Sequence, residues 1–344
     1  MSKRLDFYTL KTNYDTVVFD MDGVMTSEQT YWDCAALTAY EYLNSKDYFG
    51  SFRLKADEVI YNAESIRKNL LCNDRIITLC KNTGVNSNWD LAYITIGLWL
   101  EFANGEQCVQ YLENCHDLSN LYEFTAQVIS EKSLRSIDEC RRNKSFWNEV
   151  VSCFQEWYLG YDEYVRLYSK QPVLKGKPFL CEAEKPLLDL AELSNLLKLL
   201  INSGITLGVA TGRNTFEISV PLKKWGIYDF FDQSRIITYD YVQNAENVLL
   251  QKGIEYSLAK PAPYCFVKSA LGNSFSDEDI VSGNYNVNSR VLVVGDAGAD
   301  IFAAQHAGFD FLAVLTGVNG ESARGFFEKN KATYINNSLL DICK

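Results

Sequence analysis

The chain of 344 residues carries a formal net charge of −11, and 47% of its residues are hydrophobic while 22% are charged. This composition provides enough apolar material for a packed core, which excludes a disordered chain, and the length favours two domains. The acidic balance argues against nucleic acid or an anionic membrane surface as the main partner.

The first predicted element is a buried parallel strand at residues 16–19 (TVVF), which Asp20 follows directly. From residue 28 to residue 177 the pattern changes to amphipathic helical segments with few strand-like alternations. We therefore expect an all-helical cap domain, residues 28–177, inserted after the first strand. A stretch with two prolines, a glycine and two lysines (QPVLKGKP) supports a boundary near its end.

Two more apolar runs have the same strand character, residues 205–210 (ITLGVA) and 291–295 (VLVVG), and each ends in a polar residue. Helical patterns precede the first run, at residues 186–204, and follow the second, at residues 300–308. This alternation predicts an α/β fold, with a doubly wound, Rossmann-like parallel sheet formed by residues 1–27 and 178–344.

The chain has no apolar segment as long as the ~18 residues of a membrane span and no N-terminal signal-peptide pattern. Its ten cysteines form no Cys-x-x-Cys pair and no cluster with zinc spacing. We expect reduced thiols, a cytoplasmic location and no membrane partner. The sequence leaves the oligomeric state open.

The polar residues that end the three strands are expected to meet, because the carboxyl ends of parallel strands share one edge of the sheet. They are Asp20, Thr211 and Asp296. Asp22 lies on the same loop as Asp20, and Asp300 follows Asp296 by one helical turn. Two carboxylates 4 Å apart repel by ~4 kcal/mol at an effective dielectric near 20, so this cluster requires a cation. Oxygen ligands without histidine or cysteine favour Mg²⁺.

Thr211 is followed by Gly212, Arg213 and a predicted helix beginning near Asn214. A hydroxyl and free backbone amides at such a position can bind a phosphate oxygen. Arg213 adds a positive charge or points to solvent, and Lys260 is the candidate for a second positive charge beside the carboxylates.

In this arrangement the sequence resembles the haloacid dehalogenase superfamily, whose four motifs it carries in order. They are DMDGV at residues 20–24, the strand that ends in Thr211, Lys260 in KPAP, and GDAGAD at residues 295–300. The resemblance implies that Asp20 is a nucleophile that forms an aspartyl-phosphate and that Asp22 is the general acid and then the general base. Thr211 and Lys260 would hold the transferring phosphoryl group.

The same resemblance implies a magnesium site made by Asp20, the backbone carbonyl of Asp22 and Asp296. Asp300 would be a further ligand through water or the partner that orients Lys260. Dehalogenases of the superfamily lack the acid two residues after the nucleophile, so the presence of Asp22 favours phosphoryl transfer.

We therefore expect a magnesium-dependent phosphatase that acts on a small phosphorylated metabolite. A sugar phosphomutase similar to beta-phosphoglucomutase is an alternative, although Trp32 stands about where those enzymes place a histidine. A second alternative is a non-catalytic binding protein on the same fold. The predicted cap is about twice the usual length in the family, and we expect it to close over the site and select the substrate.

Overall fold

The computed structural model describes residues 3–85, 87–254, 256–287 and 289–343. The chain forms two compact units. The core unit comprises residues 1–27 and 184–344, and the helical unit comprises residues 28–183. The helical unit thus ends after Ala183 rather than after Lys177, where the sequence analysis placed the boundary. The segment after Lys177 still packs on this unit, because a Cβ atom built on Gly160 of the last long helix would lie only 2.7 Å from the backbone nitrogen of Phe179.

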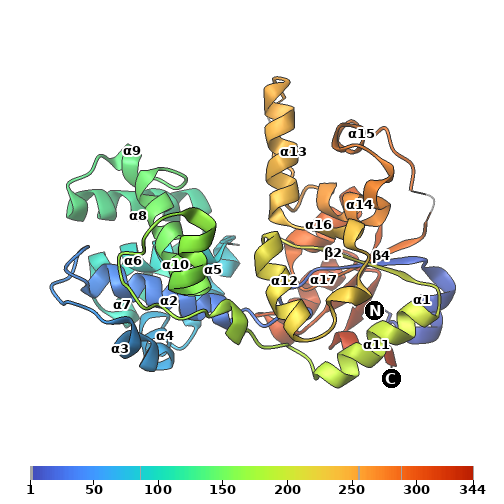
Figure 1. The fold of residues 1–344 in the computed structure, drawn as a ribbon, viewed down its shortest axis with the longest axis horizontal. Helices are drawn as coiled ribbons and strands as arrows, with labels where there is room; N and C mark the ends of the chain where they lie inside the picture. The colour runs from blue at the N-terminus through green and yellow to red at the C-terminus, as the bar shows by residue number, and fades with distance from the viewer. Residues whose placement is uncertain (1–2, 86, 255, 288, 344) are drawn as a thin grey trace. The chain divides into compact units, whose positions relative to one another are not determined.

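The core unit contains a six-stranded parallel sheet in the order β3-β2-β1-β4-β5-β6 (Figure 1). The strands are β1 (Thr16–Phe19), β2 (Thr206–Ala210), β3 (Ile236–Ile237), β4 (Val291–Gly295), β5 (Asp310–Val314) and β6 (Tyr334–Asn336). β1, β2 and β4 are the three strands predicted from the sequence, and they lie side by side at the centre of the sheet. Both faces of these strands are buried, which explains their uninterrupted apolar runs.

Helices cover both faces of the sheet, so the doubly wound α/β fold is confirmed. The helices of the core unit are α1 (Phe7–Asn13), α11 (Leu190–Asn202), α12 (Thr215–Lys224), α13 (Tyr239–Gln251), α14 (Tyr264–Leu271), α15 (Asp277–Val281), α16 (Gly298–His306) and α17 (Arg324–Lys329). Short 3-10 helices are η2 (Tyr228–Phe230), η3 (Gln233–Arg235), η4 (Gly272–Ser274), η5 (Gly320–Ala323) and η6 (Leu339–Cys343).

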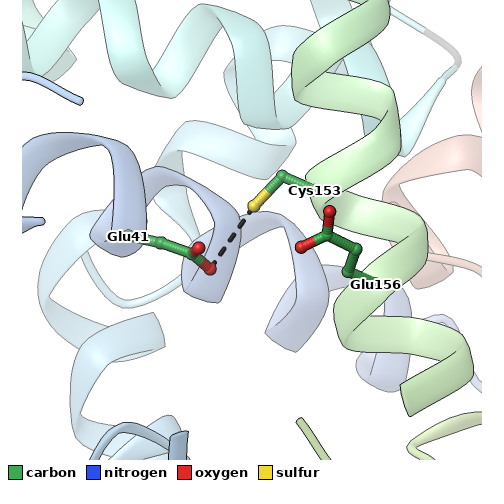
Figure 2. Close-up of side chains that lie close together, drawn as sticks. All are labelled: Glu41, Cys153 and Glu156. Atoms are coloured by element: carbon green, nitrogen blue, oxygen red, sulfur yellow. Dashed lines mark hydrogen bonds between the residues drawn. The ribbon is translucent and has the colours of Figure 1, made fainter. Parts of the chain in front are cut away.

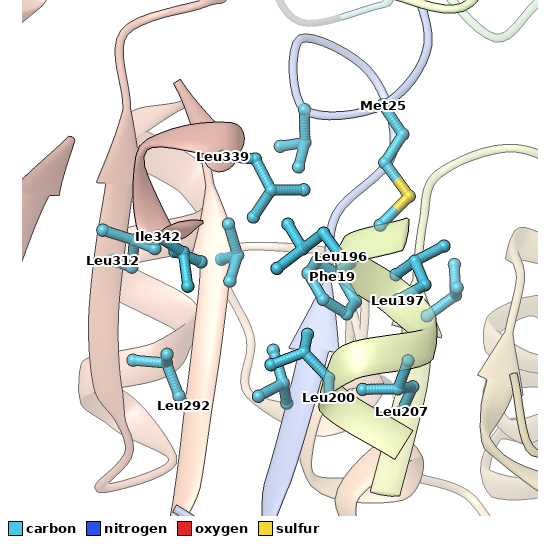
Figure 3. Close-up of a cluster of buried hydrophobic side chains, with 14 of the residues drawn as sticks. Phe19, Met25, Leu196, Leu197, Leu200, Leu207, Leu292, Leu312, Leu339 and Ile342 are labelled. Atoms are coloured by element: carbon cyan, nitrogen blue, oxygen red, sulfur yellow. The ribbon is translucent and has the colours of Figure 1, made fainter. Parts of the chain in front are cut away.

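Alternation along β1 divides the core into two layers, because successive side chains of a strand point to opposite faces. Phe19 packs with α11, whose leucines recur at helical spacing and whose N-cap is Asp189. Figure 3 shows three of these leucines, Leu196, Leu197 and Leu200, near Phe19. Val18 packs in the second layer, with side chains of α14, α16 and α17. Because both faces of β1 are packed, the carboxyl end of the strand, which Asp20 follows, is held in place.

The helical unit consists of α2 (Gln29–Asn44), α3 (Ala56–Tyr61), α4 (Ala63–Leu70), α5 (Arg75–Thr83), α6 (Asn88–Phe102), α7 (Gly105–Asn114), α8 (Leu118–Ser133), α9 (Ile137–Cys140), α10 (Ser145–Tyr168) and the 3-10 helix η1 (Cys181–Ala183). Residues 28–85 and 87–183 contain no β-strand, as the sequence predicted. Tyr31 stacks on Phe154 and Tyr158 and is buried, so its role here is packing. Across the described part of the chain, no helix has the length and apolar character needed to cross a membrane.

A cluster of charged side chains is buried inside the helical unit, between α2 and α10 (Figure 2). The Nζ atom of Lys177 lies 2.7 Å from Glu41 Oε2 and 2.6 Å from Glu156 Oε2. The Sγ atom of Cys153 lies 3.4 Å from Glu41 Oε2, and the indole nitrogen of Trp157 donates to the same oxygen at 2.8 Å. The lysine thus occupies the position between the two carboxylates.

Candidate active site

The loop after β1 turns sharply and carries two of the predicted site carboxylates. Asp20 follows the last residue of the strand, and its amide donates to Val294 O of β4 at 2.8 Å. Gly23 has a φ of 72°, a left-handed conformation that glycine adopts without steric cost, and its amide donates to Thr26 O at 3.0 Å. The Thr26 hydroxyl donates to Asp22 Oδ1 at 2.9 Å. The turn therefore fixes both the backbone and the Asp22 side chain.

Lys260 joins two of the carboxylates. Its Nζ atom lies 2.6 Å from Asp20 Oδ1 and 2.8 Å from Asp300 Oδ1, and 4.7 Å from the centre of the Phe266 ring. Asp300 lies in the first turn of α16, where its Oδ2 accepts the Ala297 amide at 3.2 Å. The structure thus brings Asp300 into contact with Lys260, and the two roles that the sequence left open for Asp300 both remain predictions.

Burial and neighbouring charges shift the pKa values of Asp20 and Lys260. The pKa of Asp20 is raised to about 7, chiefly by burial and by the negative charge of Asp300, although the charge of Lys260 opposes the rise. Burial alone would lower the pKa of Lys260, but the neighbouring charges of Asp20 and Asp300 raise it above its usual value. Lys260 is therefore a permanent positive charge. Among the described residues the hydrogen bond to Asp20 reaches Oδ1, and none reaches Oδ2.

Asp296 follows β4 and lies against two glycines from other loops. A Cβ atom built on Gly317 would lie 1.7 Å from Asp296 Oδ2, and one built on Gly23 would lie 2.3 Å from the same oxygen. Real Cβ atoms do not approach an oxygen so closely, so both positions need glycine if Asp296 is to stay in place. The hydroxyl of Thr316, next to Gly317, donates to Gly23 O at 2.6 Å and ties the two loops together.

Arg213 is buried, with only 3% of its surface exposed, and it contacts two carboxylates. Its Nη2 lies 2.6 Å from Asp22 Oδ1, and its Nε lies 3.1 Å from Asp22 Oδ2. Its Nη1 lies 2.7 Å from each oxygen of Glu184. Arg213 therefore does not point to solvent. Its guanidinium group forms ion pairs with Asp22 and Glu184.

Thr211 and Gly212 lie at the same sheet edge as Asp20, because β2 pairs in parallel with β1. The Thr211 amide donates to Ile237 O at 3.0 Å, and its hydroxyl accepts the Arg213 amide at 3.2 Å. Gly212 is exposed. The predicted helix follows as α12, with Asn214 as its N-cap. The backbone around Gly212 therefore remains available to an anionic ligand.

The carboxylates of Asp20, Asp296 and Asp300 satisfy the requirements of a hard cation. One oxygen from each lies within 4.8 Å of the others. Three carboxyl groups face the single positive charge of Lys260, and all the donors are oxygens, which is the ligand set that Mg²⁺ prefers. The side chain of Asp22 is not part of this group, because it is bonded to Arg213 and Thr26.

Two residues of this region were missed by the sequence analysis. Glu184 lies far from any motif and is buried by its pair with Arg213. Gly317 lies within the VLTGVNG segment, and only its proximity to Asp296 reveals its importance. No local pattern in the sequence signals either contact.

No curated protein sequence matches this chain. An X-ray structure determined by the Northeast Structural Genomics Consortium is 26% identical, with a TM-score of 0.73 over 95% of this chain and 97% of its own. Phosphatase Tt82 from Thermococcus thioreducens is 17% identical, with a TM-score of 0.50 over 91% of this chain and 97% of its own.

A hydrolase of family IA, variant 3, from Entamoeba histolytica is 14% identical, with a TM-score of 0.43 over 94% of this chain and 92% of its own.

The family model of the haloacid dehalogenase-like hydrolases matches residues 14–308 of this chain. The matched part includes Asp20, Asp22, Lys260, Asp296 and Asp300. The chain therefore belongs to the haloacid dehalogenase-like hydrolase family.

Proposed function

We propose that this chain is a magnesium-dependent phosphatase that hydrolyses a small phosphomonoester through an aspartyl-phosphate on Asp20. The observation that carries the proposal is the contact of Lys260 with both Asp20 and Asp300. This contact leaves one oxygen of Asp20 for attack and keeps a positive charge beside it. Phosphoryl transfer depends mainly on such positioning and charge neutralisation.

In the first step, Asp20 Oδ2 attacks phosphorus, and the bond from phosphorus to the ester oxygen breaks. Asp22 gives its proton to the departing oxygen, so an alcohol leaves. In the second step, Asp22 takes a proton from water as the water attacks phosphorus, and the bond from phosphorus to Asp20 Oδ2 breaks. Inorganic phosphate leaves, and both aspartates return to their starting states.

The remaining residues bind and orient the phosphoryl group. Lys260 and the Thr211 hydroxyl balance the charge of its oxygens, and the exposed backbone at Gly212 lies at the same sheet edge. Asp20, Asp296, Asp300 and the Asp22 carbonyl would hold Mg²⁺, which would neutralise the phosphate and reduce its repulsion of the carboxylates.

The test is phosphate release from a panel of phosphomonoesters, with Mg²⁺ and with chelator, for the wild type and for Asp20→Asn. We expect release that requires Mg²⁺ and is lost in Asp20→Asn. Asp15→Asn is the matched control, because Asp15 precedes the same strand at its other end and pairs with Arg290 at 3.0 Å. Metal-independent release, or an active Asp20→Asn variant, contradicts the proposal. Isomerisation of a sugar phosphate without phosphate release would instead identify a phosphomutase.

A further inference from the structure

Arg213 connects two carboxylates that come from distant parts of the chain. Asp22 lies on the loop that leads out of the core unit, and Glu184 is the first residue of the core unit after the helical unit. Glu184 uses both oxygens on Nη1 of Arg213, whereas Asp22 is bonded to Nε and Nη2. The guanidinium is therefore held on one side by Glu184 and holds Asp22 on the other.

The two connecting segments are also bonded to one another within the core unit. Thr26 forms an antiparallel bridge with Pro186. The Leu187 amide donates to Met25 O at 2.8 Å, and the Ser27 amide donates to Lys185 O at 3.3 Å. Glu184 directly precedes this short ribbon of paired backbone, which limits where its own backbone can lie.

The charges of Arg213 and Glu184 are both buried, so their pairing must offset the cost of desolvation. Arg213 is 3% exposed and Glu184 is 4% exposed, so neither charge is solvated by bulk water. A buried guanidinium needs carboxylates in good geometry, because its desolvation is costly. The two bonds from Nη1 to Glu184 restrict how the planar group can present Nε and Nη2 to Asp22.

We propose that Glu184 is a positioning residue that acts through Arg213 to fix the carboxyl group of Asp22, the group that transfers the proton. This inference rests on the proposed phosphatase function. Glu184 itself touches neither the reacting phosphoryl group nor Asp20 in this assignment. Its effect is confined to the step in which Asp22 protonates the departing oxygen and to the step in which Asp22 activates water.

The leaving group provides a readout that a merely structural role would not change. An alkyl phosphomonoester, such as glycerol 2-phosphate, releases a strongly basic alkoxide unless the oxygen is protonated as it departs. The aryl ester p-nitrophenyl phosphate releases a stable phenolate that needs little protonation. The value of kcat/KM reports the step in which Asp20 is phosphorylated, so the ratio of the aryl to the alkyl value measures how well Asp22 donates its proton.

We expect Glu184→Gln to lower kcat/KM for the alkyl ester by about tenfold or more and for the aryl ester by less than about threefold. Glu184→Asp, which keeps the charge, should restore part of the alkyl activity. In an Asp22→Asn background, Glu184→Gln should cause no further loss, because the group that it positions is already absent. The ratio does not depend on the fraction of folded enzyme, so it remains informative if a variant is unstable.

Asp341→Asn is the matched control, since Asp341 is also a buried carboxylate beside an arginine, Arg4, in the core unit. It should leave the ratio unchanged. Equal losses on both esters in Glu184→Gln, or additive losses in the double variant, overturn the inference while the proposed function stands. A wild type that hydrolyses neither ester with Mg²⁺, nor any other ester of the panel, overturns the proposed function and the inference with it.

Discussion

The Nζ atom of Lys260 lies 2.6 Å from Oδ1 of Asp20, and the two residues are 240 positions apart in the chain. Their side chains are only 12% and 11% exposed, so the pair is shielded from solvent. Asp300 accepts from the same ammonium group. Lys260 therefore balances two buried carboxylates at once. Removing it should cost more free energy of unfolding than removing one member of a surface ion pair.

Replacing Lys260 by methionine should lower both stability and activity. Removing one member of a buried charge cluster leaves the others uncompensated, and we expect the free energy of unfolding in chelator to fall by about 3 kcal/mol. Mg²⁺ should restore part of this loss, because a bound cation again balances the carboxylates. Urea denaturation with and without Mg²⁺ measures both effects, and Lys260→Arg, which keeps the charge, is the control. Equal stability of Lys260→Met and the wild type in chelator would contradict the charge-balancing role.

Asp20 should make the metal-free protein less stable as the pH rises. Its pKa in the folded chain is raised from 3.8 to about 7, first by burial. The folded state therefore binds more protons than the unfolded state between pH 4 and 7, and stability is lost as the pH rises through this interval. We expect Asp20→Asn to gain stability over the wild type by about 1 kcal/mol or more on going from pH 4 to pH 8 in chelator.

Asp15→Asn is a control of opposite sign. Hydrogen bonds from Arg290 lower the pKa of Asp15, so this carboxylate contributes stability above its usual pKa and loses that contribution as the pH falls. Thermal unfolding of both variants across the same pH series tests the two signs together. A difference between Asp20→Asn and the wild type that does not change with pH would show that Asp20 is ionised normally.

Gly317→Ala should weaken metal binding without changing any ligand. The added Cβ would lie 1.7 Å from Asp296 Oδ2, so the carboxylate must move away from its place beside Gly23. We expect the Mg²⁺ concentration that gives half-maximal activity to rise by about tenfold or more. Gly325→Ala is the matched control, since a Cβ at Gly325 would meet nothing within 4 Å. An unchanged Mg²⁺ dependence in Gly317→Ala would mean that Asp296 does not bind the metal.

Lys177→Met should destabilise the protein through the helical unit. Lys177 is the cation between Glu41 and Glu156, and its side chain is fully buried. Without it the two carboxylates face one another, so we expect the free energy of unfolding to fall by about 3 kcal/mol. Lys175 is exposed on the same segment, and Lys175→Met should change stability by less than about 0.5 kcal/mol. Equal effects of the two variants would exclude a stabilising role for the buried cluster.

Three central strands were predictable because burial on both faces gives an uninterrupted apolar run. The outer strands were not. β3 has only two residues, Ile236–Ile237, and β6 has three, Tyr334–Asn336, which is too short for a pattern. β5 begins with the exposed Asp310. These strands form because a neighbouring strand is already in place, and that neighbour is remote in the sequence.

The site was predictable to the extent that its residues follow predicted strands or lie in the family's motifs. Asp20 and Asp300 both contact Lys260, and for Asp300 this contact was one of two alternatives that the motifs left open. The contact between Arg213 and Glu184 depends instead on burial and on the direction of two side chains. The local sequence around Glu184 does not indicate which residue it contacts. Its burial and its pairing with Arg213 are seen only in the folded chain.

The ribbon formed by Thr26 and Pro186 has a consequence for how such a protein can evolve. Backbone hydrogen bonds join the segment that leads into the insertion to the segment that follows it, and both segments belong to the core unit. The two ends of the insertion are thus held next to each other by the core unit itself. A change in the length of the insertion therefore need not displace the sheet or the residues at its carboxyl edge.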